Sequence, residues 1–265
     1  MRNPNELDLI KDCGAQNHDE RARSGICLSA NEQKKLAAKT AVDTLIEQGR
    51  IFSGMKIGLG TGSTAMFAVE RIAERIADAT LTDIKAVATS FQTENRCRAL
   101  AIPLFTLNDP VIGGALDLTI DGADAIDNNN NLIKGGGGAL LREKVAAYCS
   151  KNYVIVADES KLASALGADF PVPVEIIGFA RLSVENEMTK LGARCVLREG
   201  VKKCGPVITD NGNQILDCLW EKAVNSAEME AKINAIAGVV ENGFFTKTRA
   251  TIFIGGSGGL VRMRG

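Results

Sequence analysis

The chain has 265 residues, a hydrophobic content of 45% and a formal net charge of -1. These values describe an ordinary globular protein, long enough for one large domain or two smaller ones. A balance of 31 basic and 32 acidic residues argues against a nucleic-acid or membrane surface. No apolar run reaches the ~20 residues of a membrane span, and the polar N-terminus lacks a signal-peptide core, so we expect a cytoplasmic protein.

Cysteine and histidine usage restricts the chemistry. The chain holds 7 cysteines, scattered and without a CxxC pair, which predicts reduced thiols. The single histidine, His18, lies in a polar N-terminal extension, residues 1–28. A zinc site or a Ser-His-Asp triad would require His18 to fold back. Acid–base work therefore falls to carboxylates and lysines.

A capping box opens the first predicted helix. Ser29 and Glu32 have the required spacing, and apolar residues recur at helical intervals until Gly49. Lys34 lies at the N-terminal end of the same stripe and could reach an anion. A lysine that extends from a helix edge into water is the commoner explanation.

The next predicted strand, residues 55–59, runs into GLGTGSTA (58–65) and a second helix. This segment satisfies GxGxxA, the fingerprint of a dinucleotide site, but a lone match is weak. The following predicted strand, 84–88, ends in Thr89 and Ser90 and offers no carboxylate for a ribose.

A Walker loop is excluded as well, because no lysine precedes Ser63 or Thr64. What remains is a hydroxyl-rich helix start made of Thr61, Gly62, Ser63 and Thr64. Its amides and side chains can bind a small phosphoester.

Further strands are predicted at 103–106, 116–120 and 153–157, separated by helices or loops. This alternation predicts a parallel sheet with helices on both faces. Lys161 follows the last of these strands and would lie at the carboxyl edge of the sheet, although an exposed lysine at a helix start is an equally good interpretation.

The segment DGADAIDNNNNLIKGGGGALLREK (121–144) concentrates acidic, basic and anion-binding groups. The buried strand before it delivers Asp121 to the carboxyl edge of the sheet, where open α/β sheets bind ligands. Four glycines after Lys134 indicate positive φ or close approach of the backbone to a ligand. Amides at this helix start, beside Lys134, can hold an oxyanion or a phosphate. The alternative is a flexible linker.

Glu143 is the candidate base. A helix that starts near Gly138 places Glu143 among apolar side chains, where loss of hydration raises the pKa of a carboxyl group. These neighbours are Ala139, Leu140, Ala146 and Ala147. A raised pKa suits a general base near neutral pH. The alternative is a surface glutamate between Arg142 and Lys144.

The pattern of predicted strands and helices changes at Pro171 and Pro173. Beyond them we predict strands at 174–177, 194–197, 206–209, 214–218 and 239–240, with helices at 180–191 and 227–235. This pattern resembles a small ferredoxin-like α+β fold. A last strand, 251–254, would return to the first sheet. We therefore predict a Rossmann-like catalytic domain (29–168 and 248–265) and a ferredoxin-like domain (169–247).

Four motifs in register, GLGTGSTA, DGAD, KGGGGALLREK and ADESK, resemble ribose-5-phosphate isomerase of the A type. The resemblance runs from about Lys34 to the C-terminus. It implies a cytoplasmic, self-associating enzyme of the pentose phosphate pathway, expected to be a homodimer. Such an enzyme interconverts ribose 5-phosphate and ribulose 5-phosphate through an enediolate, without metal or cofactor.

The same resemblance implies roles for individual residues. Glu143 would shuttle a proton between C1 and C2, Asp121 would assist ring opening, and Lys134 would stabilise the enediolate. The implied substrate-binding residues are Lys34, Thr61, Gly62, Ser63, Thr64, Asp121, Gly122, Ala123, Asp124, Lys134, Gly135, Gly136, Gly137 and Lys161.

One departure from the family pattern is Ala125, where DGADE is usual. Two rival classes stay open. A non-catalytic sugar-phosphate sensor would need an attached DNA-binding segment, for which residues 1–28 are short and insufficiently basic. A related amino-sugar phosphate deaminase or a coenzyme A transferase is the other; a deaminase would be expected to use a histidine, and His18 is misplaced.

Overall fold

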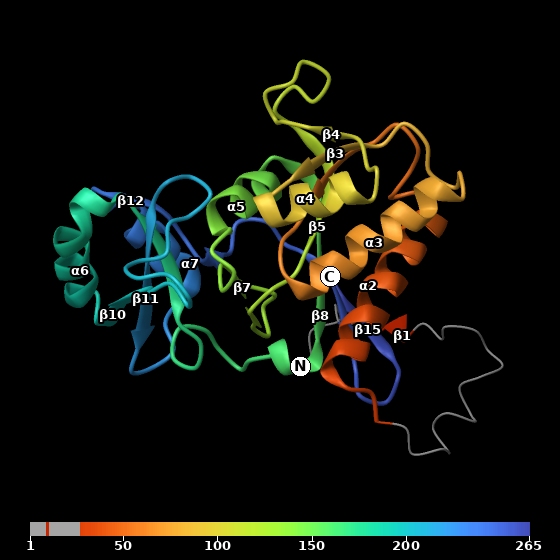
Figure 1. Ribbon diagram of the computed structural model, residues 1–265. Helices are drawn as coiled ribbons and strands as arrows, with labels where there is room; N and C mark the ends of the chain where they lie inside the picture. Colours follow the sequence, from red (N-terminus) through yellow and green to blue (C-terminus); the bar gives the residue numbers. More distant parts are fainter. Residues whose placement is uncertain (1–8, 11–26) are drawn as a thin grey trace. The chain divides into compact units, whose positions relative to one another are not determined.

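A computed structural model describes residues 9–10 and 27–265 (Figure 1). The contacts divide the chain into two units. The first comprises the described residues up to Gly122, Cys149–Lys161 and Ala250–Gly265, and the second comprises Ala123–Tyr148 and Leu162–Arg249. His18 and most of the N-terminal extension lie outside the described residues.

The first unit is organised around a sheet of eight strands in the described part of the chain. In spatial order these are β1 (Leu9–Ile10), β15 (Val261–Arg264), β14 (Thr251–Gly255), β8 (Ser150–Asp158), β5 (Leu116–Asp121), β2 (Lys56–Leu59), β3 (Lys85–Ala88) and β4 (Leu104–Phe105). From β14 to β4 every neighbouring pair is parallel. All predicted strands of this sheet are confirmed, including the return of β14.

Helices α2 (Ala30–Glu47), α3 (Ser63–Ala77) and α4 (Phe91–Ala99) accompany this sheet, with the short turn η1 (Glu159–Lys161) after β8. The predicted capping box is confirmed: Ser29 accepts from the Glu32 amide, and Glu32 accepts from the Ser29 amide. Apolar side chains of α2, α3 and the strands form one continuous core, which buries Leu45, Ile72 and Val154 completely. Burial of this core is the main term that stabilises the unit.

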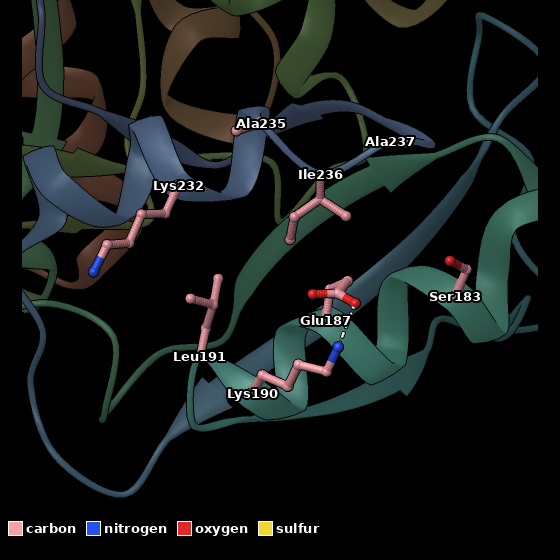
Figure 2. Close-up of a pocket in the computed structure, with 8 residues that line it drawn as sticks. All are labelled: Ser183, Glu187, Lys190, Leu191, Lys232, Ala235, Ile236 and Ala237. Carbon is pink, nitrogen blue, oxygen red and sulfur yellow. Dashed lines mark hydrogen bonds and ion pairs between the residues drawn. The ribbon is translucent and has the colours of Figure 1, made fainter.

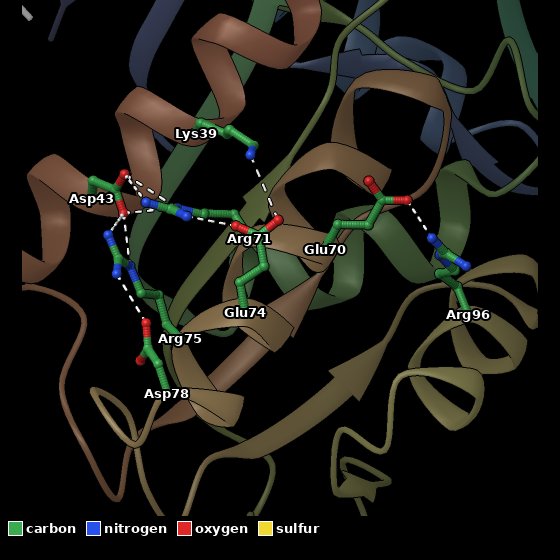
Figure 3. A network of polar contacts seen from close by, with 8 residues as sticks. All are labelled: Lys39, Asp43, Glu70, Arg71, Glu74, Arg75, Asp78 and Arg96. Carbon is green, nitrogen blue, oxygen red and sulfur yellow. Dashed lines mark hydrogen bonds and ion pairs between the residues drawn. The ribbon is translucent and has the colours of Figure 1, made fainter.

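Polar residues join α2 and α3, which lie side by side (Figures 1 and 3). Asp43 of α2 accepts from Arg71 at 2.6 Å and from Arg75 at 2.9 Å. Hydrogen bonding to Asp43 raises the pKa of both guanidinium groups. Glu74 and Asp78 pair with the same two arginines, so a chain of alternating charges fixes the register of the helices.

The second unit contains a four-stranded antiparallel sheet with the order β10-β11-β9-β12. These are β10 (Ala193–Leu197), β11 (Gln214–Trp220), β9 (Val172–Ile176) and β12 (Val239–Asn242), with η2 (Gly178–Ala180), α6 (Arg181–Lys190) and α7 (Ser226–Asn234) between them in the chain. This is the predicted ferredoxin-like βαββαβ order. With the parallel sheet of the first unit, it confirms the predicted fold class.

Two features of the second unit differ from the prediction. Residues 206–209 form no strand: only Pro206 makes an isolated bridge, to Glu199. The Val207 amide donates to the Arg198 carbonyl at 2.9 Å, but the Arg198 amide donates to Ile215 of β11, so the pairing with residues 206–209 does not continue. A three-stranded sheet was also not predicted, because its strands have only two residues each: β6 (Ala125–Ile126), β7 (Leu132–Ile133) and β13 (Phe244–Phe245).

The domain boundaries at 168/169 and 247/248 remain a prediction, since compact units defined by contacts are not necessarily folding domains. The described cysteines are free thiols, of which Cys27 and Cys204 are exposed. In residues 9–10 and 27–265, no helix is both long and apolar enough to cross a bilayer.

Candidate active site

The candidate residues fall into two groups, one in each unit. In the first unit they gather where the strand order reverses. From β2 the chain proceeds outward to β3 and β4, and it then returns to the other side of β2 with β5. Ligands of open α/β sheets bind outside the carboxyl ends of the strands at such a point. Thr61 follows β2 and Asp121 ends β5, so both lie at this edge.

Asp121 is fully buried and holds the turn after β2 in place. Its Oδ1 accepts from the amide of Thr61 at 3.1 Å and from that of Gly122 at 2.7 Å. The Thr61 hydroxyl contacts the hydroxyls of Thr89, Ser90 and Thr93 at 2.7–3.2 Å. From the sequence alone, Thr89 and Ser90 indicate only that this strand end offers no carboxylate for the ribose of a dinucleotide. Their actual role is to anchor Thr61.

The start of α3 has features that suit the predicted anion site. The cap residue Gly62 has φ 97° and provides no side-chain cap, so the first amides of α3 lack the usual side-chain acceptor. Ser63 is exposed, and its hydroxyl accepts from Lys34 Nζ at 3.3 Å. A helix N-terminus with an adjacent ammonium group favours a phosphate. Lys34 also lies 4.0 Å from Asp158 Oδ2, whereas Lys161 lies in η1.

Substitution of Gly60 tests the packing of the turn after β2 against Asp121. An added Cβ would lie 2.6 Å from the Asp121 Cα and 2.0 Å from its Oδ1. We expect Gly60→Ala to displace Asp121, to lower the free energy of unfolding by ~1–3 kcal/mol and to reduce turnover. Thermal unfolding and steady-state kinetics measure the two effects. Gly258→Ala is the control, because its Cβ would meet nothing within 4 Å; equal behaviour of the two variants would contradict the prediction.

The second group centres on α5 (Leu140–Tyr148). Glu143 is 4% exposed and Lys134 is 2% exposed, and Lys134 Nζ lies 3.4 Å from Glu143 Oε2. The apolar neighbours predicted for Glu143 are all buried: Ala139, Leu140, Ala146 and Ala147. The surface interpretation of Glu143 is therefore wrong. The apolar pattern could not reveal the ammonium group of Lys134. Burial disfavours the charged form of a carboxylate, and a neighbouring ammonium group favours it.

A second buried lysine fixes α5. Lys144 Nζ lies 2.8 Å from Glu241 and 3.3 Å from Glu230, while Tyr148 donates to Glu230 at 2.7 Å. Burial lowers the pKa of Lys144, and the two glutamates act in the opposite direction. The Phe245 ring lies 4.8 Å from Lys144 Nζ and 5.6 Å from Lys134 Nζ. These partners are 82 or more positions away in the chain, so sequence spacing gave no signal for them.

The glycine run is an ordered turn before α5. Gly135 and Gly138 have positive φ, and the Gly138 amide donates to the Gly135 carbonyl at 2.9 Å. The Gly136 amide donates to Asp124 Oδ2 at 2.7 Å, where a Cβ on Gly136 would clash with that carboxylate. Asp124, Lys134 and the glycines are thus held together within the second unit. The linker interpretation is wrong.

A cavity of about 570 Å³ also lies in the second unit (Figure 2). Residues of α6, Lys232 of α7 and the segment that follows α7 line it, with Glu187 and Lys190 on the α6 side. None of the candidate residues lines this cavity, so its size carries no functional argument. In the described part of the chain, no cluster of three or more His, Cys, Asp or Glu side chains is arranged to hold a metal ion.

The fold and these side chains define a class: a Rossmann-like α/β protein with a glycine- and hydroxyl-rich turn before α3 and a buried carboxylate–lysine pair. Residues 85–259 match the family model of ribose 5-phosphate isomerase A (phosphoriboisomerase A). A ribose-5-phosphate isomerase A from Treponema denticola is 53% identical over 229 residues, which cover 86% of this chain and 96% of that protein.

Solved structures agree. Ribose 5-phosphate isomerase A from Methanocaldococcus jannaschii superposes with a TM-score of 0.81 at 39% identity, covering 89% of this chain and 100% of that one. A D-ribose-5-phosphate isomerase in complex with phospho-erythronic acid superposes with a TM-score of 0.83 at 37% identity, covering 89% of this chain and 100% of that one. The chain belongs to the ribose 5-phosphate isomerase A family, and it is an isomerase.

Proposed function

We propose that this chain interconverts D-ribose 5-phosphate and D-ribulose 5-phosphate through an enediolate, with Glu143 as the base. Family membership supports the reaction class. A related isomerase binds phospho-erythronic acid, a phosphorylated sugar acid, which supports a sugar phosphate as the ligand. The buried Lys134–Glu143 pair is the observation that carries the mechanism.

Glu143 would take a proton from one carbon of the open-chain sugar and return it to the neighbouring carbon. Such a step requires a carboxylate that is ionised yet little hydrated. Burial removes water from Glu143, and the Lys134 ammonium 3.4 Å away favours the charged form. A positioned general base contributes ~10²–10⁴ in rate.

Lys134 would act on the oxygen. As the proton leaves carbon, negative charge develops on the adjacent carbonyl oxygen, and a fixed cation beside amide donors stabilises it. Lys134 and the amides of Gly135–Gly137 belong to one short segment, so they are preorganised together. Asp124 would bind sugar hydroxyls beside them.

The remaining candidates keep the roles that the family resemblance implies. We assign substrate binding to the start of α3 (Thr61–Thr64) with Lys34, and to Lys161 after β8. Asp121 would assist ring opening and move a proton between the sugar oxygens, with Gly122 and Ala123 providing backbone contacts. A homodimer in the cytoplasm remains part of this proposal.

The direct test is conversion of ribose 5-phosphate by the purified protein, followed beside a panel of other pentose and hexose phosphates. We expect turnover with ribose 5-phosphate without added metal, and no change of rate with a chelator. Incorporation of solvent deuterium at C2 of the substrate tests the enediolate. Turnover restricted to another sugar phosphate would contradict the substrate assignment, and complete absence of exchange would favour a hydride shift or a shielded proton.

A further inference from the structure

Arg198, directly after β10, is tied to the glycine run. Its side chain is 17% exposed. Nε and Nη2 donate to the two carboxylate oxygens of Asp217 on β11, at 2.8 and 2.5 Å. Nη1 donates to the carbonyl oxygens of Gly135 at 2.9 Å and Gly136 at 3.2 Å. One guanidinium group thus links the sheet to two consecutive peptides of the run.

These two hydrogen bonds fix the direction of the next amides. In a planar trans peptide the N–H points opposite to the C=O. A guanidinium group that holds the carbonyls of Gly135 and Gly136 therefore directs the N–H groups of Gly136 and Gly137 to the opposite side. The Gly136 amide meets Asp124 there, at 2.7 Å. Beside Gly137 the space is open, because an added Cβ would meet nothing within 4 Å.

The contact also has an electrostatic effect. A cation on a carbonyl oxygen polarises the peptide and makes its N–H a stronger donor. Asp217 compensates the charge through a bidentate pair that fixes the plane of the guanidinium group. Only a planar fork with several donors can bind Asp217 and two carbonyls at once, so lysine is not equivalent to arginine here.

We propose that Arg198 is a positioning residue for the reaction: through the Gly136 carbonyl it orients and polarises the Gly137 amide toward the developing oxyanion, and through the Gly135 carbonyl it keeps the Gly136 amide on Asp124. This inference rests on the proposed function. Arg198 itself touches neither the reacting atoms nor Glu143, and its effect is confined to the transition state and to anions that resemble it.

The test compares Arg198→Met and Arg198→Lys with Arg194→Met, which removes an exposed arginine from β10, the strand before Arg198. For Arg198→Met we expect kcat to fall ~10–10²-fold with KM changed less than ~3-fold. For Arg198→Lys we expect kcat to fall ~3–10-fold, and for Arg194→Met we expect the kcat and KM of the wild type. Phospho-erythronic acid is the anionic probe, and its inhibition constant should rise in proportion to the loss of kcat.

Thermal unfolding of each variant separates positioning from stability. Added guanidinium ion should restore part of the kcat of Arg198→Met if the cation acts locally. Wild-type kcat and probe affinity in Arg198→Lys, or in a folded Arg198→Met, would overturn the inference while leaving the proposed function intact. A wild-type protein without isomerase activity would overturn the proposed function and this inference together.

Discussion

Glu143→Gln should lower kcat by at least ~10²-fold while leaving KM within ~3-fold of the wild-type value. Glutamine has the shape of glutamate and keeps a hydrogen-bonding oxygen near Lys134, so the packing of α5 is preserved. It cannot accept a proton from carbon. The loss therefore falls on the chemical step, and steady-state kinetics with ribose 5-phosphate measures it.

Glu175→Gln is the matched control. Glu175 is also buried in the second unit, where its Oε1 accepts from the Thr209 hydroxyl at 2.8 Å and from the side-chain amide of Asn213 at 2.9 Å. We expect this variant to change the free energy of unfolding and not kcat. Near-normal turnover of a folded Glu143→Gln protein would show that another group is the base.

The fold was largely predictable because its signals are local. The strands of the parallel sheet are short apolar runs between turn residues, and the capping box at Ser29 marks the start of α2. The ferredoxin-like order followed from the sequence of elements after Pro173. The two-residue strands β6, β7 and β13 were not predicted, since so short a segment has no measurable periodicity. The strand predicted at 206–209 is wrong because the Arg198 amide donates to Ile215 of β11 instead, a choice of partner that no local pattern shows.

The candidate site was predictable only in part. Spacing within one segment placed Lys134, the glycines and Glu143 near each other, and the structure brings Lys134 and Glu143 into an ion pair. Contacts between residues far apart in the chain could not be predicted from the sequence. Arg198 lies 63 positions from Gly135, and Lys144 lies 97 positions from Glu241. No periodicity or motif connects such residues; only the folded sheets bring them together.

Lys134→Met should lower kcat ~10²–10³-fold, the loss expected when one oxyanion donor is removed. Methionine fills a similar volume against Phe245, so the apolar contacts of the side chain are retained. The variant should also change the pH dependence. Without the ammonium group 3.4 Å away, the buried Glu143 carboxylate loses the charge that favours ionisation. The acidic limb of the kcat profile should therefore move to higher pH.

That second effect distinguishes two roles of Lys134. If Lys134 only stabilises the developing oxyanion, kcat falls at every pH and the acidic limb stays in place. If it also keeps Glu143 ionised, part of the lost activity returns as the pH rises. Lys232→Met, which removes a lysine of α7 with a half-exposed side chain, should leave both kcat and its pH profile unchanged. Turnover of a folded Lys134→Met protein within ~3-fold of the wild type across the whole pH range would remove Lys134 from the proposed mechanism. A buried cation that stabilised the developing oxyanion could not be lost without a larger cost.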